Sequence, residues 1–486
     1  MKTKRFFVLL AVSLVLLVYS CAGEPETGGA EVPGGGGEDS ETAPREEAAA
    51  ELSPNLPDDA DFGGTDFRLL LSGWSGVDFE VEELTGDRLD DAIFLRNRRI
   101  EEQFNINITT TNLDPFDSFG PSNDFFRRSV RAGVDDFDVF FGIQQWSFVD
   151  SMEGLNVEFT EYLPWVNFDK PWWDSGILDV GFGDRIFFAA GDITHSTLGY
   201  TTLLLFNKDL FDDLGLTHPY QYVRDGTWTW DRFTGMIRGM ERDLNGDGVM
   251  TPGEDLFTIS GWQFELPYNF HTVLGGNEVI KNAQGFPEIN IFAEQSLRAV
   301  NMVLDLFSEY GGFFNNRAYG FCREKFMNRQ LLFLDVRMFE IVRYGFRYME
   351  DDFGMIPHPK LNESVPHHTQ LVNNNVVTVT AVPATNDRRD MTAILLEALA
   401  YEGWRHITPE YKEVLLQTKM VRDEDSAEMF YYIWGHRTYR FGLQAFDNVL
   451  NARVVGRGER AFVSVYEALA DRAEAEIEQI IEVFFR

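Results

Sequence analysis

The chain has 486 residues, a formal net charge of −36, and hydrophobic and aromatic fractions of 44% and 14%. A chain of this length exceeds what one ordinary hydrophobic core organises, so we expect two domains. The strong negative charge would repel nucleic-acid phosphates, and it argues against a polybasic membrane-binding patch.

The first 21 residues have the pattern of a bacterial export signal. Lys2, Lys4 and Arg5 form a positive start, and residues 6–18 form an apolar run that is short for a membrane span. Residues 18–21, Val-Tyr-Ser-Cys, resemble a lipobox, in which the cysteine becomes the lipidated N-terminus after cleavage. We therefore expect lipidation at Cys21, with ordinary secretion and a leftover thiol as the alternative.

Residues 22–64 form a predicted disordered acidic tether ahead of a folded body at 65–486. The tether is rich in Gly, Glu, Pro, Ala and Ser, and its one basic residue is Arg45. Such a composition cannot bury enough apolar surface to offset the entropy of ordering the chain. The sequence has only one further cysteine, Cys322, which excludes an internal disulfide framework.

Short apolar strands alternate with segments of helical spacing along the body. We expect strands at 67–72, 105–109, 137–141, 186–190, 202–206, 256–260, 331–334 and 376–382, and a strand and loop at 353–359. We expect helices at 87–104, 123–132, 207–215, from 231 to about 242, 293–310, 322–328, 389–416 with a break at Thr408-Pro409, and 459–484. This alternation predicts an α/β protein with mostly parallel sheets flanked by helices and ligand loops at the strands' carboxyl ends.

One stretch, residues 185–216, carries a closer signal. It reads as a strand, a polar crossing that begins at Gly191-Asp192, a second strand and a short helix, with the sequence Phe-Asn-Lys-Asp-Leu at 206–210. This stretch resembles the crossover of extracellular solute-binding proteins of ABC importers, of the carbohydrate-type, maltose-binding-like class. Residues 87–108, 227–233, 353–359 and 391–433 resemble other parts of the same family.

The resemblance implies a two-lobed fold of the type II periplasmic-binding-protein class, with a ligand cleft between the lobes. It implies a first lobe at about 65–200 plus 383–440 and a second at about 201–382 plus 441–486.

Residues 243–254 fit the loop motif of EF-hand calcium sites in full. The predicted ligands are the side chains or carbonyls that the motif places around a hard cation: Asp243, Asn245, Asp247, the Val249 carbonyl, Thr251 and Glu254. We expect a helix that ends near Arg242 to enter the loop and a strand to leave it, and a structural role for Ca²⁺. An acidic turn without an ion is the alternative.

Aromatic and polar residues recur on the predicted loops at strand ends. Sugars present apolar C–H faces that stack on aromatic rings, and hydroxyls that need planar polar partners, so both kinds of residue suit a carbohydrate cleft. The candidate ligand residues are Trp74, Gln144, Gln145, Trp146, Asp192, His195, Trp262, Asp335 and Arg337. The alternative for any single tryptophan is a place in the core, and the alternative for His195 is a hydrogen bond at the hinge without ligand contact.

We expect the substrate-binding component of an ABC importer, which captures a carbohydrate, with an oligosaccharide favoured, by hinge closure. The expected protein is a monomer anchored by lipid to the extracellular face of the bacterial cytoplasmic membrane, where it meets the permease subunits. No catalytic residue is assigned, because no phosphate loop, nucleophile elbow or His-pair zinc motif occurs in a suitable context. The alternatives are a surface-anchored glycoside hydrolase, which needs two carboxylates within roughly 5–10 Å, and a carbohydrate-binding lipoprotein without a transporter.

Overall fold

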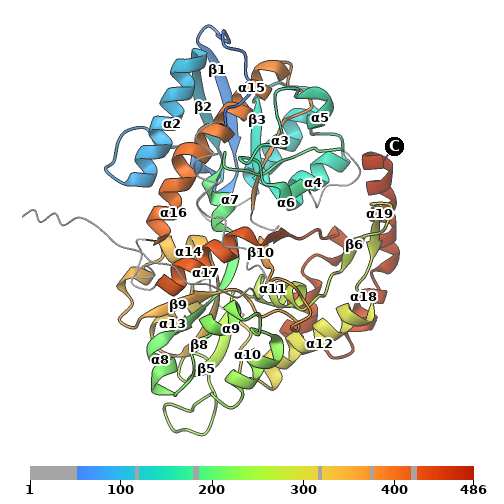
Figure 1. The fold of residues 1–486 in the computed structure, drawn as a ribbon. Helices are drawn as coiled ribbons and strands as arrows, with labels where there is room; N and C mark the ends of the chain where they lie inside the picture. The colour runs from blue at the N-terminus through green and yellow to red at the C-terminus, as the bar shows by residue number, and fades with distance from the viewer. Residues whose placement is uncertain are drawn as a thin grey trace, which may run out of the picture. The chain divides into compact units, whose positions relative to one another are not determined.

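Two four-stranded sheets organise the part of the chain that the computed structural model describes (Figure 1). The structure describes residues 52–114, 120–178, 185–315, 320–372, 377–416 and 424–485. The predicted signal peptide, Cys21 and most of the predicted tether lie outside these residues. Within these ranges, no helix combines the length and the apolar character needed to span a bilayer.

The first sheet has the strand order β11-β3-β1-β2. Its strands are β1 (Thr65–Leu71), β2 (Ile106–Asn112), β3 (Val139–Ile143) and β11 (Thr378–Ala381). β1 pairs in parallel with β2 and β3, whereas β11 returns from far along the chain and pairs antiparallel with β3. The sheet is therefore mostly parallel, as predicted, and α2 (Arg88–Phe104), α3 (Pro121–Arg131) and α15 (Arg389–Glu402) pack around it (Figure 1).

The second sheet has the order β5-β8-β4-β9 and mixes strand directions. Its strands are β4 (Thr202–Asn207), β5 (Phe257–Gly261), β8 (Leu331–Arg337) and β9 (Phe353–Ile356). Only β5 and β8 pair in parallel, because β4 enters between β8 and β9 in the opposite direction. This sheet therefore departs from the mostly parallel arrangement that the strand and helix alternation predicted.

The remaining elements connect and cover the sheets. In chain order they are η1 (Gly73–Asp78), α4 (Gln144–Met152), α5 (Phe159–Tyr162), α6 (Ser175–Leu178), α7 (His195–Gly199), α8 (Lys208–Asp213), α9 (Tyr220–Arg224), α10 (Trp230–Ile237), α11 (Leu266–Val273), β6 (Val279–Lys281), β7 (Pro287–Ile289), α12 (Glu294–Ser308), α13 (Phe321–Met327), α14 (Met338–Arg343), η2 (Phe346–Tyr348) and β10 (Gln370–Val372). They continue with η3 (Gly403–Ile407), α16 (Thr408–Leu416), α17 (Glu424–Gly435), β12 (Arg437–Tyr439), η5 (Gln444–Phe446), η6 (Val449–Val454), η7 (Val455–Arg457), α18 (Phe462–Glu467) and α19 (Ala470–Phe485).

Several predicted boundaries need correction. The apolar run at 186–190 makes only an isolated bridge, from Ala189 to Thr380 of β11. α10 ends at Ile237 instead of near residue 242, because Gly239 follows with a positive φ that no helix continues through. The predicted terminal helix at 459–484 is two helices, α18 and α19.

The long C-terminal helical segment begins without the break predicted at Thr408-Pro409. Instead, α15 runs through the π-helical turn η3 into α16. Gly403, at the start of η3, makes this packing possible, since a Cβ at that position would lie 1.9 Å from the Asp192 carbonyl oxygen. The helix backbone therefore rests directly on the crossing segment.

α19 joins elements that lie far apart in the sequence. The Phe484 ring stacks on Phe148 of α4 at a centroid distance of 5.5 Å and meets Phe187 edge-on at 5.0 Å. The next residue, Phe485, packs on Phe286 beside the β6–β7 hairpin at 4.3 Å. The end of α19 therefore connects α4 with this hairpin through aromatic contacts.

We expect Phe484→Ala to lower the free energy of unfolding by about 3 kcal/mol, because it removes a buried ring and leaves a cavity. Phe292→Ala is the matched control, since Phe292 is 38% exposed and should cost less than about 0.5 kcal/mol. Denaturant unfolding of both variants measures the difference. Equal losses would contradict the role assigned to α19.

Burial raises the pKa of Asp192 to about 7, an effect that Thr408, Arg437 and Lys412 only partly offset. The folded protein then binds more protons than the unfolded chain between about pH 4 and 7, so raising the pH across this window lowers the stability. Asn at this position carries no such penalty. We expect the stability of Asp192→Asn relative to the wild type to increase by up to about 4 kcal/mol from pH 4 to 7, and a flat difference would refute the buried-acid assignment.

Candidate functional site

The crossing segment between the two sheets is fixed through one buried carboxylate. α7 begins at His195, whose Nδ1 lies 2.6 Å from Oδ1 of Asp78 at the end of η1. The Ser196 backbone N–H and hydroxyl donate to the two oxygens of the same carboxylate, at 3.1 and 2.5 Å. His195 is thereby held at a defined place in a short helix, and not on a loop as predicted.

A buried guanidinium completes this arrangement. Arg96 of α2 is fully buried and donates to the Ile193 carbonyl at 2.9 Å and to the Asp78 carbonyl. Burial lowers the pKa of Arg96 to about 10, which leaves the side chain charged at neutral pH. α2, η1 and the crossing segment are therefore tied together at one point.

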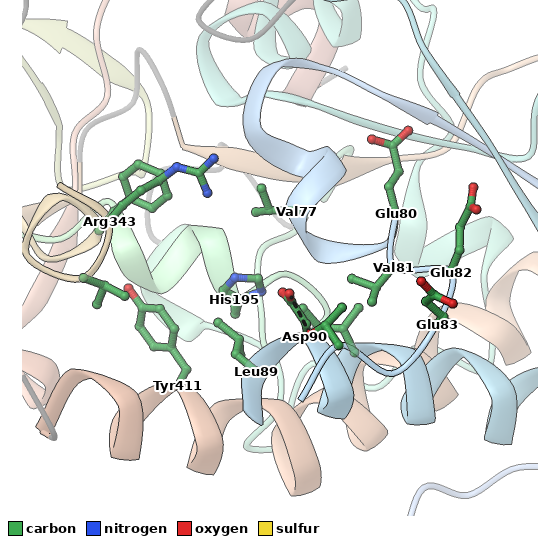
Figure 2. Close-up of a pocket in the computed structure, with 14 residues that line it drawn as sticks. Val77, Glu80, Val81, Glu82, Glu83, Leu89, Asp90, His195, Arg343 and Tyr411 are labelled. Atoms are coloured by element: carbon green, nitrogen blue, oxygen red, sulfur yellow. Dashed lines mark hydrogen bonds between the residues drawn. The ribbon is translucent and has the colours of Figure 1, made fainter. Parts of the chain in front are cut away.

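A cavity of about 550 Å³ opens beside His195 (Figure 2). Its walls come from η1 and the segment that follows it, and from the helices α2, α7, α14 and α16. The lining residues are Val77, Glu80, Val81, Glu82, Glu83, Thr85, Leu89, Asp90, Ile93, His195, Phe339, Val342, Arg343 and Tyr411. We call this cavity the His195 pocket.

Two aromatic side chains, Tyr411 and Phe339, line the pocket together with His195. The Tyr411 ring lies 5.5 Å from the His195 ring, and Phe339 faces the same space from α14. Gly199 lets both approach, since a Cβ there would lie 2.9 Å from the Tyr411 hydroxyl and 3.0 Å from Cβ of Phe339. The Tyr411 hydroxyl is buried and has no hydrogen-bond partner among the described residues, and burial raises its pKa, so it remains a neutral donor.

A buried arginine lies next to this pocket. Arg337 Nε donates to Glu340 Oε1 at 3.0 Å and lies 3.6 Å from Glu265 Oε1. Its guanidinium carbon is 5.1 Å from the Trp262 ring centroid and 5.8 Å from that of Tyr200. We call these residues the Arg337 group.

The Arg337 group and the His195 pocket share a wall. The Tyr200 ring stacks on Phe339 at a centroid distance of 6.0 Å, and Phe339 lines the pocket. Two sequence-predicted residues, Trp262 and Arg337, are therefore linked through Tyr200 to Phe339, and a third, His195, lines the same pocket as Phe339.

Asp335 lies near the Arg337 group, but both of its carboxylate oxygens already have hydrogen-bond partners. Its two carboxylate oxygens each accept from Asn269 Nδ2 at 3.0 Å, and His358 Nε2 lies 2.7 Å from one of them. Both Asp335 and Arg337 lie within β8, which extends to residue 337, and not on a loop after it.

The other predicted ligand residues lie elsewhere. Gln144, Gln145 and Trp146 form the first turn of α4 instead of a loop, and Gln144 Nε2 donates to the Arg440 carbonyl at 3.2 Å. The backbone carbonyl of Asp192 packs against Gly403 at the start of η3. Trp74 belongs to η1, and its side chain is outside the part that the structure describes.

Sequence reasoning missed Tyr200, Phe339 and Tyr411. Each carries an ordinary core signal, because an aromatic residue in a helix or beside a strand is more often packed than functional. Tyr411 and Tyr200 had a local signal, since they fall within the segments at 391–433 and 185–216 that resemble the family, whereas Phe339 had none.

The predicted calcium loop is held by its own hydrogen bonds. The Asp243 carboxylate accepts from the backbone N–H groups of Gly246 and Gly248 at 2.7 and 2.8 Å. Asn245 Nδ2 donates to Asp247 at 3.3 Å and to Glu254 at 3.1 Å, so three of the motif's side chains meet, and these oxygen-bearing groups suit a hard cation.

The surroundings of this loop differ from those of an EF-hand. An antiparallel bridge from Arg242 to Leu256 closes the loop where a helix was expected to enter it. Across the described residues, no group of three or more His, Cys, Asp or Glu side chains is placed to hold a metal ion. Calcium binding by Asp243, Asn245, Asp247, Val249, Thr251 and Glu254 stays a prediction.

Comparisons with known proteins place the fold. No protein-family model and no curated protein matches the sequence. Among solved structures, the sugar-binding protein MalE of Xanthomonas citri is similar at 13% identity, with a TM-score of 0.59 over 87% of this chain and all of that one. MalE of Bdellovibrio bacteriovorus bound to maltotriose matches at 15% identity and 0.53, over 86% of this chain and 100% of that one.

An ABC substrate-binding protein from Listeria monocytogenes in complex with cycloalternan matches at 12% identity and a TM-score of 0.53, over 86% of this chain and 98% of that one. At such identities the matches speak for the fold alone. The described chain, with its two sheets flanked by helices, therefore has the type II periplasmic-binding-protein fold of the maltose- and maltodextrin-type ABC sugar-binding proteins.

Proposed function

We propose that this chain is the extracytoplasmic substrate-binding component of an ABC importer and that it captures a carbohydrate at the His195 pocket and the Arg337 group. The observation that carries the proposal is the set of aromatic and polar side chains at the pocket: His195 packs on Tyr411, and Phe339, which lines the same pocket, stacks on Tyr200 beside Arg337 and Trp262. Aromatic rings suit the C–H faces of a sugar, and oriented polar groups suit its hydroxyls.

The elements around these side chains suit capture by closure. His195 and Tyr200 lie on and just after α7, which follows β1, β2 and β3 of the first sheet in the chain. Arg337, Phe339 and Trp262 lie on or next to strands of the second sheet. A ligand that contacts both sets of residues stabilises the arrangement in which they are close. An oligosaccharide is the preferred ligand within this proposal, since the solved relatives include proteins bound to maltotriose and cycloalternan.

The rest of the proposal concerns location and partners. Lipidation at Cys21 and an acidic tether would keep the binding protein near the membrane, where permease subunits receive the sugar. These features rest on the sequence pattern of residues 1–64.

Two buried carboxylates next to the pocket bear on the hydrolase alternative. Glu265 and Glu340 both lie within 3.6 Å of Arg337 Nε and are almost fully buried. A glycosidase needs its pair to face the scissile bond, one member as acid and the other as base or nucleophile. Here both carboxylates contact the same guanidinium, an arrangement that favours a role in orienting Arg337.

We expect calorimetry with the purified protein to detect binding of a mono- or oligosaccharide that is recovered unchanged afterwards. Trp262→Ala should weaken this binding about tenfold or more, because it removes the ring on which the Arg337 guanidinium and the sugar would rest. The control is Tyr431→Ala, which removes an exposed ring of α17. A cleaved sugar would establish the hydrolase instead, and no binding of any sugar would overturn the carbohydrate proposal.

We also propose that the loop at 243–254 binds Ca²⁺ in a structural role. At ten times its dissociation constant the ion should add about 1.4 kcal/mol to the free energy of unfolding, and Asp243→Asn should abolish this gain. Asp471→Asn, an exposed change on α19, should keep it. Identical melting of the wild type in Ca²⁺ and in chelator would refute the site.

A further inference from the structure

The rim of the His195 pocket is strongly acidic on one side. Glu82 and Glu83 line it with exposed side chains, and neither carboxylate has a hydrogen-bond or charged partner among the described residues. Glu80 and Asp90 lie on the same side of the opening, and Arg343 lies on the opposite side (Figure 2). A ligand in the pocket therefore meets an excess of negative charge on the side of Glu82 and Glu83.

Acidic surface is common on a chain with a net charge of −36, so the rim by itself does not define a site. The independent observation is Tyr411, which is 2% exposed, lines the same pocket on the side of Arg343 (Figure 2), and has a hydroxyl without a partner among the described residues. Leaving a buried hydroxyl without a hydrogen bond costs stability. A ligand hydroxyl in the pocket would supply the missing partner.

The apolar part of the pocket lining limits what this ligand can be. Val77, Val81, Leu89 and Phe339 contribute apolar surface to the pocket lining. The volume of about 550 Å³ falls in the range of small-ligand sites. A simple inorganic cation would leave the apolar surface unused, whereas a sugar ring covers it with its C–H face.

We propose that the ligand is a saccharide that carries a protonated amine. Its ring packs on the apolar lining residues, a hydroxyl pairs with Tyr411, and the ammonium group faces Glu82 and Glu83. This inference rests on the proposed function and narrows it to amino sugars. Neutral sugars would gain hydrogen bonds but no charge attraction from the two carboxylates, and sugar acids would be repelled by them.

The first test compares sugars that differ in the group at C2, which is an ammonium, a neutral acetamide or a neutral hydroxyl. Calorimetry at pH 6 measures binding of glucosamine dimers, of the N-acetylated dimers and of the corresponding glucose dimers, with each of the common linkages. We expect the glucosamine form to bind about tenfold more tightly than its two neutral counterparts, and the advantage to shrink when NaCl is raised from about 0.05 to 0.5 M. Equal or tighter binding of a neutral form overturns the amine assignment and leaves carbohydrate capture standing, whereas failure of every sugar to bind overturns both.

The second test places the charge effect on the rim. Glu82→Gln combined with Glu83→Gln should weaken binding of the amino sugar about threefold to tenfold, as expected for two exposed charge pairs, and leave the neutral sugar unaffected. The matched control, Glu474→Gln with Glu478→Gln on α19, changes the net charge equally and should alter neither affinity. An equal loss for both sugars in the rim variant, or a loss in the control, overturns the proposal.

Discussion

The position of the candidate site depends on the buried pair of Asp78 and Arg96. The carboxylate of Asp78 receives the Ser196 N–H and hydroxyl and contacts His195, while Arg96 holds the Ile193 carbonyl. A buried charge is stable only when its hydrogen-bonding capacity is met, so each group needs the crossing segment in this conformation. The first sheet's helices thereby position the start of α7, and with it the wall of the pocket.

A second buried charge cluster organises the other side of the site. Arg337 lies between Glu265 and Glu340 and under the Trp262 and Tyr200 rings. Removing one member would leave the others buried without compensation, which is why such clusters are rigid. The aromatic rings around it are consequently held in place, and the two glutamates are occupied by the arginine.

The helices after β11 support the crossing segment and line the pocket. α16 contributes Tyr411 to the pocket, and η3 passes over the Asp192 backbone at Gly403. Glu397 of α15 accepts from the indole N–H groups of Trp172 and Trp173 at 3.0 and 2.8 Å, which secures the segment before the crossing. The C-terminal part of the chain therefore supports the site and also contributes to it.

The strand and helix pattern could be predicted from the sequence wherever local periodicity was strong. β1, β4, β5, α2 and α8 appear within a few residues of their expected places, because apolar spacing and caps such as Asp87 and Asn207 act locally. The resemblance at 206–210 led to the correct fold class. Boundaries failed where a single turn decided them, as at Gly239 and between α18 and α19.

Tertiary structure alone decided which aromatic residues join His195, Trp262 and Arg337 at the site. Nothing in the sequence shows that Tyr411 contacts His195 or that Phe339 stacks on Tyr200, since the members of each pair lie more than one hundred residues apart. Asp335 and Arg337 lie two residues apart on one strand, yet Asp335 pairs with Asn269 and His358, whereas Arg337 pairs with Glu340 and lies beside the Trp262 ring. The sequence by itself determined most of the elements and the fold class, because periodicity and caps are local; only folding decided which polar groups pair with each other, because pairing depends on neighbours distant in the chain.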